Sequence, residues 1–383
     1  MRLSLLNPIL THDGPWASVY VDASYTAQDA AKRQELTARA AAQELADLGA
    51  PAATCEAVHT ALAGPAGDGP IGRPKASGKR AGRAVFAAGG EVVMDVPLPG
   101  PPAAPLTTAW STLPRLTPLV RAVGDSPTCL VAYVDRIGAD FELHDDAGER
   151  DQGQVSGADW PVHKTASADW SERHFQTAVE NTWEQNAAEI AAATHQVWQR
   201  TGADVLLLVG DARERKVVRD LLPEPLRSRT AESEHGARPT GSQSPQLARD
   251  IAQVRAVREG ERAAEVLDRY HAGREDDGGG QAVAGVPALV EAAREHQIDT
   301  LLLGPAGPDA GREVWVGPKG DQLGLRSTEL QYLGEVRPAA ARADDALLRS
   351  AAASGADALV VNDPGAAPVG GLGALLRWPA GPH

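Results

Sequence analysis

The sequence predicts an α/β protein of three domains, each a mixed sheet flanked by helices. Its 383 residues exceed the usual size of one compact domain, and 43% apolar residues are enough to build several cores. Apolar runs with strand composition alternate with segments of helical periodicity, which indicates a parallel component in the sheets. The first group of elements ends near residue 125, and a polar, turn-rich linker covers 231–245. The expected domains are 1–125, 126–240 and 241–383.

The first domain opens with a strand and a helix. Residues 17–22 (Ala-Ser-Val-Tyr-Val-Asp) have strand composition, and the apolar spacing over 36–48 is helical. Two further apolar runs flank a glycine pair in 88–90, which is typical of a hairpin, and a proline-rich connector follows at 97–105. The expected elements are strands at 17–22, 84–87 and 92–96 and helices at about 27–48 and 113–123.

The second domain is organised around one long helix. Apolar side chains recur at three-, four- and seven-residue steps from Phe175 to Val197, so they form one stripe of a helix over about 172–200. Residues 205–209 (Val-Leu-Leu-Leu-Val) are typical of a buried strand, closed by Gly210. The other expected features are strands at 130–134 and 140–143, irregular sequence at 151–168, and a helix through Val217 and Leu221.

The third domain has a compact strand–helix–strand rhythm. Helical sequence over about 246–270 leads into it and ends near Gly273. No repeat at a fixed period is present, so the sequence does not predict a solenoid or a propeller. The expected elements are strands at 282–283, 300–303, 314–316, 358–361 and 372–378 and helices at about 286–296 and 342–353.

Charge is distributed unevenly along the chain, whose net charge is −14. The first domain is neutral as a whole and the second carries −8, which argues against coating nucleic acid by bulk attraction. One basic cluster lies in the loop 64–83, in a stretch rich in Gly and Pro that has no acidic residue between 70 and 90. This basic loop either fits around RNA phosphates or is a solvated surface loop. Its members are Arg73, Lys75, Lys79, Arg80 and Arg83.

The motifs of common catalytic chemistries are missing. Scattered histidines and the lack of HExxH, CxxC or an acidic calcium loop predict no metal site, and no cofactor is expected. There is no GxSxG elbow, and the segment 72–80 has one residue too many between its glycines for a P-loop. Cys55 and Cys129 lie far apart, as in a reducing cytosol. The first ten residues do not resemble a signal peptide and no apolar run could span a membrane, so a cytoplasmic protein is expected.

The triplet Gly279-Gly280-Gln281 could belong to a catalytic tip or to a turn. Class I release factors use a Gly-Gly-Gln tip to help water attack the peptidyl ester, and paired glycines let the backbone approach RNA closely. Here three carboxylates at 275–277 precede the triplet and would repel phosphates, and a short apolar strand follows directly. We interpret the triplet as a structural turn, with catalysis as the alternative.

The third domain resembles the third domain of archaeo-eukaryotic class I release factors and Pelota. The chain reads Gly280-Gln-Ala-Val-Ala-Gly285, then a helix at 286–295, then the Leu-rich strand 298–303, which is the order found in this family. The family's closing helix and strands are matched by 341–354, 355–361 and 370–378.

The other two domains extend the resemblance. The strands over 130–143, the long helix near 172–200 and the strand 205–209 are similar to the family's second domain. Val19-Tyr20-Val21-Asp22 and the helix after it resemble the bacterial branch of the superfamily, which includes proteins related to Balon, a ribosome hibernation factor. The resemblance implies a three-domain architecture like that of release factors and Pelota.

The resemblance also implies where a catalytic tip would lie. In release factors it precedes the long helix of the second domain, and the matching segment here is 161–175. That segment has no glycine pair and no positioned glutamine, so no catalytic residue is expected. Its side chains could contact rRNA near the peptidyl transferase centre, with Trp170 either stacking on a base or covering the start of the helix. The residues of this middle-domain tip are His163, Lys164, Trp170, Arg173 and His174.

The resemblance implies two main functions. The first is a factor that binds rRNA in the ribosomal A site and protects idle ribosomes, with a translational GTPase, EF-Tu, as its partner. The second is a peptidyl-tRNA hydrolase or rescue release factor that acts on stalled ribosomes through an unrecognised tip. A cytosolic RNA-binding stress protein unrelated to the A site is a third interpretation, and neither DNA nor a membrane is an expected partner.

Overall fold

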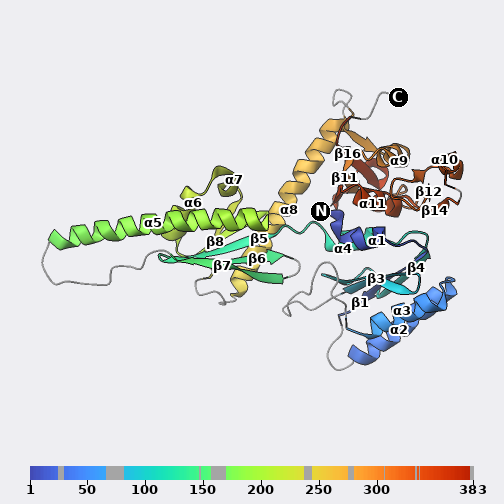
Figure 1. Cartoon of the computed structure of the whole chain (residues 1–383), viewed down its shortest axis with the longest axis horizontal. Coiled ribbons are helices and arrows are strands. Elements are labelled where there is room, and N and C mark those ends of the chain that lie inside the picture. The colour runs from blue at the N-terminus through green and yellow to red at the C-terminus, as the bar shows by residue number, and fades with distance from the viewer. Residues whose placement is uncertain are drawn as a thin grey trace. The chain divides into compact units, whose positions relative to one another are not determined.

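The structure is a computed structural model in which the chain divides into two compact units (Figure 1). Unit 1 contains Met1–Asp125 and Ala263–His383, and unit 2 contains Ser126–Arg262. Helix α8 (Pro245–Arg274) belongs partly to each unit. The described residues are 1–24, 30–65, 82–145, 148–156, 170–236, 244–274, 280–305, 307–332, 334–335 and 337–379, without the side chains of 30, 148 and 170–182.

The N-terminal segment of unit 1 is an antiparallel sheet with two helices on one face. Its elements are η1 (Leu3–Leu6), α1 (Asn7–Leu10), β1 (Trp16–Asp22), α2 (Ala30–Asp47), α3 (Ala52–Ala63), β2 (Gly82–Ala88), β3 (Glu91–Leu98), β4 (Leu106–Ser111) and α4 (Thr117–Val123). The strand order is β3-β2-β1-β4. Alternate residues of central β1 face opposite sides, so Val19 packs under α2 and α3 while Tyr20 packs on the other face. Because both faces are covered, the whole strand is apolar enough to be recognised from sequence.

The C-terminal segment of unit 1 holds two further sheets. Its elements are β10 (Ala282–Ala284), α9 (Val286–Arg294), β11 (Ile298–Leu303), β12 (Glu313–Val316), β13 (Leu323–Gly324), α10 (Ser327–Tyr332), β14 (Ala339–Arg342), α11 (Ala343–Ala353), β15 (Asp357–Val360), η2 (Val369–Gly371) and β16 (Leu372–Leu376). One sheet has the order β10-β16-β11-β15, with β11 and β15 parallel, and the smaller one has the order β13-β12-β14. Helix α11 lies directly before β15 and packs against β11.

The two segments of unit 1 share one hydrophobic core. Leu6 and Leu116 of the N-terminal segment belong to the same buried cluster as Leu347 of α11. Backbone bonds add to this packing, since the Ala358 N–H donates to the Met1 carbonyl at 2.9 Å. The N-terminal sheet is therefore joined to the C-terminal segment by a continuous interior, which extends along α11.

Unit 2 is a five-stranded mixed sheet between two helices. Its elements are β5 (Cys129–Val134), β6 (Gly138–Asp145), β7 (Gly148–Ser156), α5 (Trp170–Thr201), β8 (Val205–Val209), α6 (Ala212–Leu221), α7 (Glu224–Arg227) and β9 (Thr230–Ser233). The strand order is β7-β6-β5-β8-β9, parallel from β5 to β9 and antiparallel from β5 to β7. Ile190 of α5 packs on the face that carries Leu206, and Ile251 of α8 packs on the opposite face.

The predicted α/β architecture of mixed sheets flanked by helices is confirmed. The strand expected at 205–209 is β8, and the long helix expected over about 172–200 is α5. Parallel pairing, expected from the strand–helix alternation, joins β5 to β8 and β11 to β15. No helix in the described residues combines the length and the apolar character that crossing a membrane requires.

Several elements are absent from the sequence-based prediction, among them α3, β4, β7 and β9. The expectation of irregular sequence from residue 151 onward is wrong up to Ser156, because β7 continues to that residue. This strand is almost entirely polar and is held by its ladder with β6. Strand β9 lies at the start of the expected linker and is held in the same way by β8. A strand stabilised by its neighbour does not need an apolar pattern of its own.

Candidate functional site

Most of the predicted basic loop lies outside the described residues. Four of its five cations fall within 66–81, and the structure gives no contacts for them. They are Arg73, Lys75, Lys79 and Arg80. The fifth, Arg83 of β2, is described, and 6% of its side chain is exposed.

Arg83 ties together the two ends of the segment that carries this basic loop. Its guanidinium donates to the carbonyl of Gly64, where the loop begins, at 3.1 Å and to the carbonyl of Ala61, which precedes the loop, at 2.8 Å. On the other side it pairs with Asp95 of β3, with Nε to Oδ1 at 2.7 Å and Nη2 to Oδ2 at 2.5 Å. A guanidinium has five N–H donors, and these contacts use most of them. Among the residues predicted to contact rRNA, Arg83 is therefore a buried anchor within its own domain.

The predicted middle-domain tip precedes and begins helix α5. His163 and Lys164 lie outside the described residues. Trp170, Arg173 and His174 lie in the first turns of α5, where the backbone is described and the side chains are not. The structure therefore places the backbone of the last three at the start of the long helix, as the sequence predicts.

The Gly-Gly-Gln triplet leads into a strand. Gly279 lies outside the described residues, and Gly280 has a φ of 68°, which glycine adopts without strain. The carbonyl of Gln281 accepts a hydrogen bond from the Leu376 N–H at 2.8 Å, and β10 begins at the next residue. This arrangement fits the interpretation of the triplet as a structural turn.

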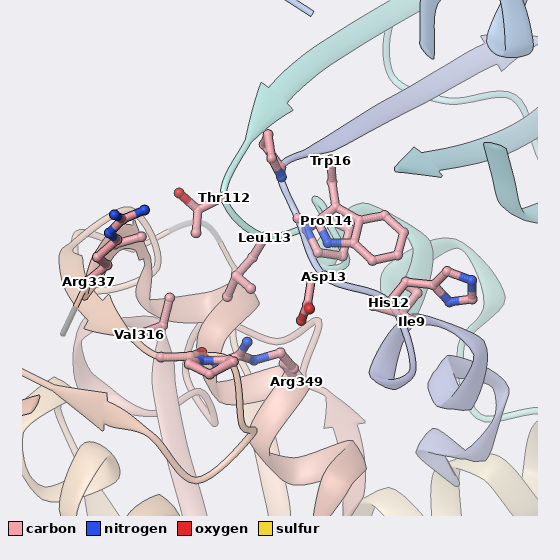
Figure 2. A pocket seen from close by; sticks show the side chains of 15 residues that line it. Ile9, His12, Asp13, Trp16, Thr112, Leu113, Pro114, Val316, Arg337 and Arg349 are labelled. Carbon is pink, nitrogen blue, oxygen red and sulfur yellow. The ribbon is translucent and has the colours of Figure 1, made fainter. Parts of the chain in front are cut away.

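A cavity of about 410 Å³ opens in unit 1, between its two segments (Figure 2). One wall is formed by the turn before β1 and by residues 112–114. The other wall is formed by the end of β12, by the residues before β14 and by α11. Most of the lining is apolar, with a few polar groups, which is the composition of small-molecule sites. Its charged and aromatic members include His12, Asp13, Trp16, Arg337 and Arg349.

Two glycines allow the close approaches that shape the walls of the cavity. A Cβ atom on Gly14 would lie 2.3 Å from the Thr112 carbonyl oxygen. A Cβ atom on Gly317 would lie 2.9 Å from Cβ of Gln322, in addition to 2.4 Å from its Oε1. These distances are far below van der Waals contact, so these positions require glycine for steric reasons.

Arg349 of α11 is the buried cation of the cavity, with 8% of the residue exposed. Its Nη2 donates to the Gly317 and Lys319 carbonyls, both at 3.0 Å, which fixes the direction of the guanidinium. Its Nε is buried and has no hydrogen-bond partner among the described residues, an omission that typically costs about 1–3 kcal/mol. Burial lowers the pKa of Arg349 to about 10, although Asp13 and Asp321 act in the opposite direction. The group therefore stays charged at neutral pH.

One turn earlier on α11, two buried carboxylates join the segments of unit 1. Oδ1 of Asp345 accepts the Leu116 N–H at 2.9 Å, and Oδ2 lies 3.2 Å from Nη1 of Arg115. Asp344 accepts the Thr117 hydroxyl at 3.0 Å. Burial, and then the charge of Asp344, raise the pKa of Asp345 to about 8. The start of α4 is thus fastened to α11 by carboxylates that have little contact with water.

One group of side chains among the described residues could hold a divalent cation. Glu142 and His144 of β6 and Glu149 of β7 bring their ligand atoms within 4.8 Å of one another. The Tyr133 hydroxyl donates to Glu142 at 2.8 Å, and Nε2 of His144 lies 3.3 Å from the same oxygen. Burial raises the pKa of Glu142, but the bonds from His144 and Tyr133 outweigh it and hold that pKa below its usual value. These bonds satisfy Glu142 without an ion, so the group is not assigned as a metal site.

Neither the cavity nor the buried carboxyl groups of α11 are predicted from the sequence. The cavity joins residues near position 14 to residues beyond 316, and no local pattern links such distant positions. One signal was available in the alanine-rich segment 343–353, which carries Asp345 and Arg349 four residues apart. Charged side chains in a segment that otherwise consists of Ala, Leu and one Ser indicate that the helix buries polar groups.

Comparison with known proteins places the chain in a family. The model of bacterial archaeo-eukaryotic release factor family 2 matches residues 128–276. Uncharacterized protein Rv2629 of Mycobacterium tuberculosis strain H37Rv is 31% identical over 386 residues, which covers 99% of this chain and 98% of that protein. Uncharacterized protein MT2704 of strain CDC 1551 matches to the same extent.

The solved structures matched by the chain are more distant in sequence. A model of ribosome-bound archaeal Pelota and ABCE1 is 14% identical, covering 99% of this chain and 95% of that one, with a TM-score of 0.41. The crystal structure of Archaeoglobus fulgidus Pelota is 16% identical, covering 77% and 79%, with a TM-score of 0.34. The protein belongs to the same family as these mycobacterial proteins, and its residues 128–276 match family 2 of the bacterial archaeo-eukaryotic release factors.

Proposed function

We propose that this protein is a ribosome-binding factor that occupies the A site and protects idle ribosomes, as a hibernation factor does, without releasing peptides. Its membership in a release-factor family supports a ribosomal partner. The observation that carries the proposal is the long helix α5, which the resemblance to release factors predicts, together with the absence of Gly-Gly-Gln from the segment 161–175 before and at its start. A protein with the release-factor architecture but without the Gly-Gly-Gln tip is better suited to occupy the A site than to hydrolyse peptidyl-tRNA there.

The proposed contact with rRNA is made by the basic loop. Arg73, Lys75, Lys79 and Arg80 would bind phosphates, for which close positive charge is the main requirement. Arg83 contributes by holding both ends of the loop, through its bonds to Gly64 and Asp95. Arg83 is given this structural role because most of its N–H donors already bond protein groups, so few are left for RNA.

The middle-domain tip would reach toward the peptidyl transferase centre. His163, Lys164, Arg173 and His174 would contact rRNA there, and Trp170 would stack on an exposed base. The partner proposed for delivery is EF-Tu. If that proposal is right, adding EF-Tu raises the fraction of protein bound to ribosomes in a pull-down.

Salt-dependent binding to 70S ribosomes tests the basic loop. We expect replacement of Arg73, Lys75, Lys79 and Arg80 by Gln to weaken binding by more than about tenfold and to flatten the salt dependence. The matched control removes four exposed cations from elsewhere, namely Lys216, Arg249, Arg312 and Arg326. Equal loss in both variants would mean that net charge, and not the loop, governs binding.

The alternative function is a peptidyl-tRNA hydrolase or rescue release factor, which the release-factor family also favours. It predicts hydrolysis of peptidyl-tRNA on stalled ribosomes by the intact protein. It also predicts loss of that activity when residues 161–169 are replaced by a Gly-Ser linker. We expect no hydrolysis above the rate without protein, and robust tip-dependent release would overturn the main proposal.

A further inference from the structure

The cavity beside Arg349 has the size and make-up of a small-molecule site, and the proposed ribosome function does not use it. Its volume of about 410 Å³ falls in the usual range for ligand pockets, roughly 300–1,000 Å³. Ile9, Leu113 and Val316 contribute buried apolar surface to its walls. A ligand with an apolar body could therefore leave water on entering it.

Three charged side chains define the polar chemistry of the cavity. The buried Nε–H of Arg349, without a partner among the described residues, is a donor in need of an acceptor. Arg337 and Asp13 are exposed at the rim, and Asp13 points toward Arg349 in Figure 2. Two cations against one carboxylate leave the cavity net positive. A fixed guanidinium N–H in such surroundings favours an anionic oxygen.

The donor and the walls are held in place before any ligand arrives. The Gly317 and Lys319 carbonyls fix the guanidinium of Arg349, and Trp16 is packed into the shared core with 1% exposed. Gly14 allows the turn before β1 to touch the backbone at Thr112. A preformed site loses little conformational entropy on binding, so a small ligand can suffice.

We propose that this cavity binds a small organic anion, a carboxylate or phosphate ester with an apolar body. Its anionic oxygen accepts the Nε–H of Arg349, and its body packs against Leu113 and Val316. Because the walls come from both segments of unit 1, the bound ligand stabilises their junction by mass action. Ligand binding is thereby coupled to the integrity of unit 1, independently of ribosome binding.

Matched probes on the full chain test the proposal. Benzoate and phenyl phosphate carry the two anionic groups on similar bodies, and benzamide is a neutral analogue of benzoate. The readouts are the Nε–H NMR signal of Arg349 and the unfolding temperature. We expect a saturable shift of that signal with at least one anion, with a dissociation constant on the order of millimolar, and at least about tenfold weaker binding of benzamide.

The two anion arms decide the class of ligand. Saturation by benzoate alone assigns a carboxylate, and saturation by phenyl phosphate alone assigns a phosphate ester. Saturation by both shows that the cavity accepts either anionic group. Equal binding of benzamide and benzoate would overturn the proposal, as would the lack of a saturable response to either anion at about 50 mM.

Exposed variants at the rim provide an independent check, because Arg349 itself also supports the backbone at Gly317. Arg337→Ala should weaken anion binding about three- to tenfold, and Asp13→Asn should strengthen it by a similar factor by removing a repulsion. Arg326→Ala, an exposed cation of the same segment outside the cavity, should leave the affinity unchanged. An equal loss with Arg326→Ala would show non-specific attraction and contradict the proposed site.

Discussion

The two compact units bury carboxyl groups in different ways. In unit 2 the buried carboxylate of Glu142 is bonded by Tyr133 and His144, nine and two residues away in sequence. In unit 1 the buried Asp345 accepts a hydrogen bond from Leu116, which is 229 residues away. Adjacent strands bring the first set together, whereas the second set requires two distant segments to pack. The stability of unit 1 therefore depends more strongly on individual polar contacts between segments.

Among the substitutions proposed here, removal of the Asp345 carboxyl group should destabilise the junction between the two segments of unit 1 the most. Asp345→Ala leaves the Leu116 N–H and the Arg115 guanidinium without their acceptor. We expect the free energy of unfolding to fall by about 3–5 kcal/mol, measured by urea denaturation. Glu313→Ala removes an exposed carboxylate of β12 and serves as the control. A loss below about 1 kcal/mol for Asp345→Ala would show that the junction does not rely on this residue.

Arg83 tests a buried charge whose partners lie within one segment. Arg83→Ala removes the buried cation that pairs with Asp95 and donates to the Ala61 carbonyl, and we expect a loss of about 2–4 kcal/mol by the same measurement. Arg39→Ala, which removes an exposed pair with Glu35, should cost less than about 0.5 kcal/mol. Similar losses for Arg83→Ala and Arg39→Ala would contradict the role of Arg83 as an anchor.

The pH dependence of stability should have opposite signs in the two units. Folded Asp345 has a raised pKa, so it binds more protons than the unfolded chain between about 4 and about 8, and stability falls as pH rises through that window. The slope cannot exceed about 1.4 kcal/mol per pH unit for one group. Folded Glu142 has a lowered pKa, so its contribution is present above the unfolded value and is lost on acidification.

Urea titrations from pH 5 to pH 8 separate these contributions when Asp345→Asn is compared with the native chain. The substitution keeps an acceptor oxygen for Leu116 and removes the titrating group. We expect it to flatten the decline toward pH 8. An unchanged slope would mean that Asp345 is not the group responsible.

The smallest effect is expected at Tyr133 in unit 2. Tyr133→Phe removes the hydroxyl that bonds Glu142 while keeping the ring, and we expect a loss of about 0.5–1.5 kcal/mol. Zinc titration of the native chain and of His144→Ala provides a second readout. If the native chain, but not His144→Ala, bound zinc tightly, the group of Glu142, His144 and Glu149 would have to be reassigned as a metal site.

The comparison also shows which features can be predicted from sequence. Strand β8 is a continuous apolar run and helix α5 has one apolar stripe, so hydrophobic pattern alone locates both. Strand β7 is polar and is stabilised by its pairing with β6, and no local sequence pattern predicts this pairing. The cavity around Arg349 is harder still, because its walls meet only after two distant segments fold together. Arg83 was predicted as one of the cations that contact rRNA. The sequence did not reveal its burial, because that depends on Asp95 and on the Ala61 carbonyl, which lie outside the loop.

The most direct test of the central claim is competition for the ribosomal A site. The protein is cosedimented with vacant 70S ribosomes while A-site tRNA is added in increasing amounts, and the protein in the pellet is quantified. We predict that it sediments with ribosomes and is displaced as tRNA fills the A site. Sedimentation that is unaffected by tRNA, or no sedimentation at all, would contradict the proposal.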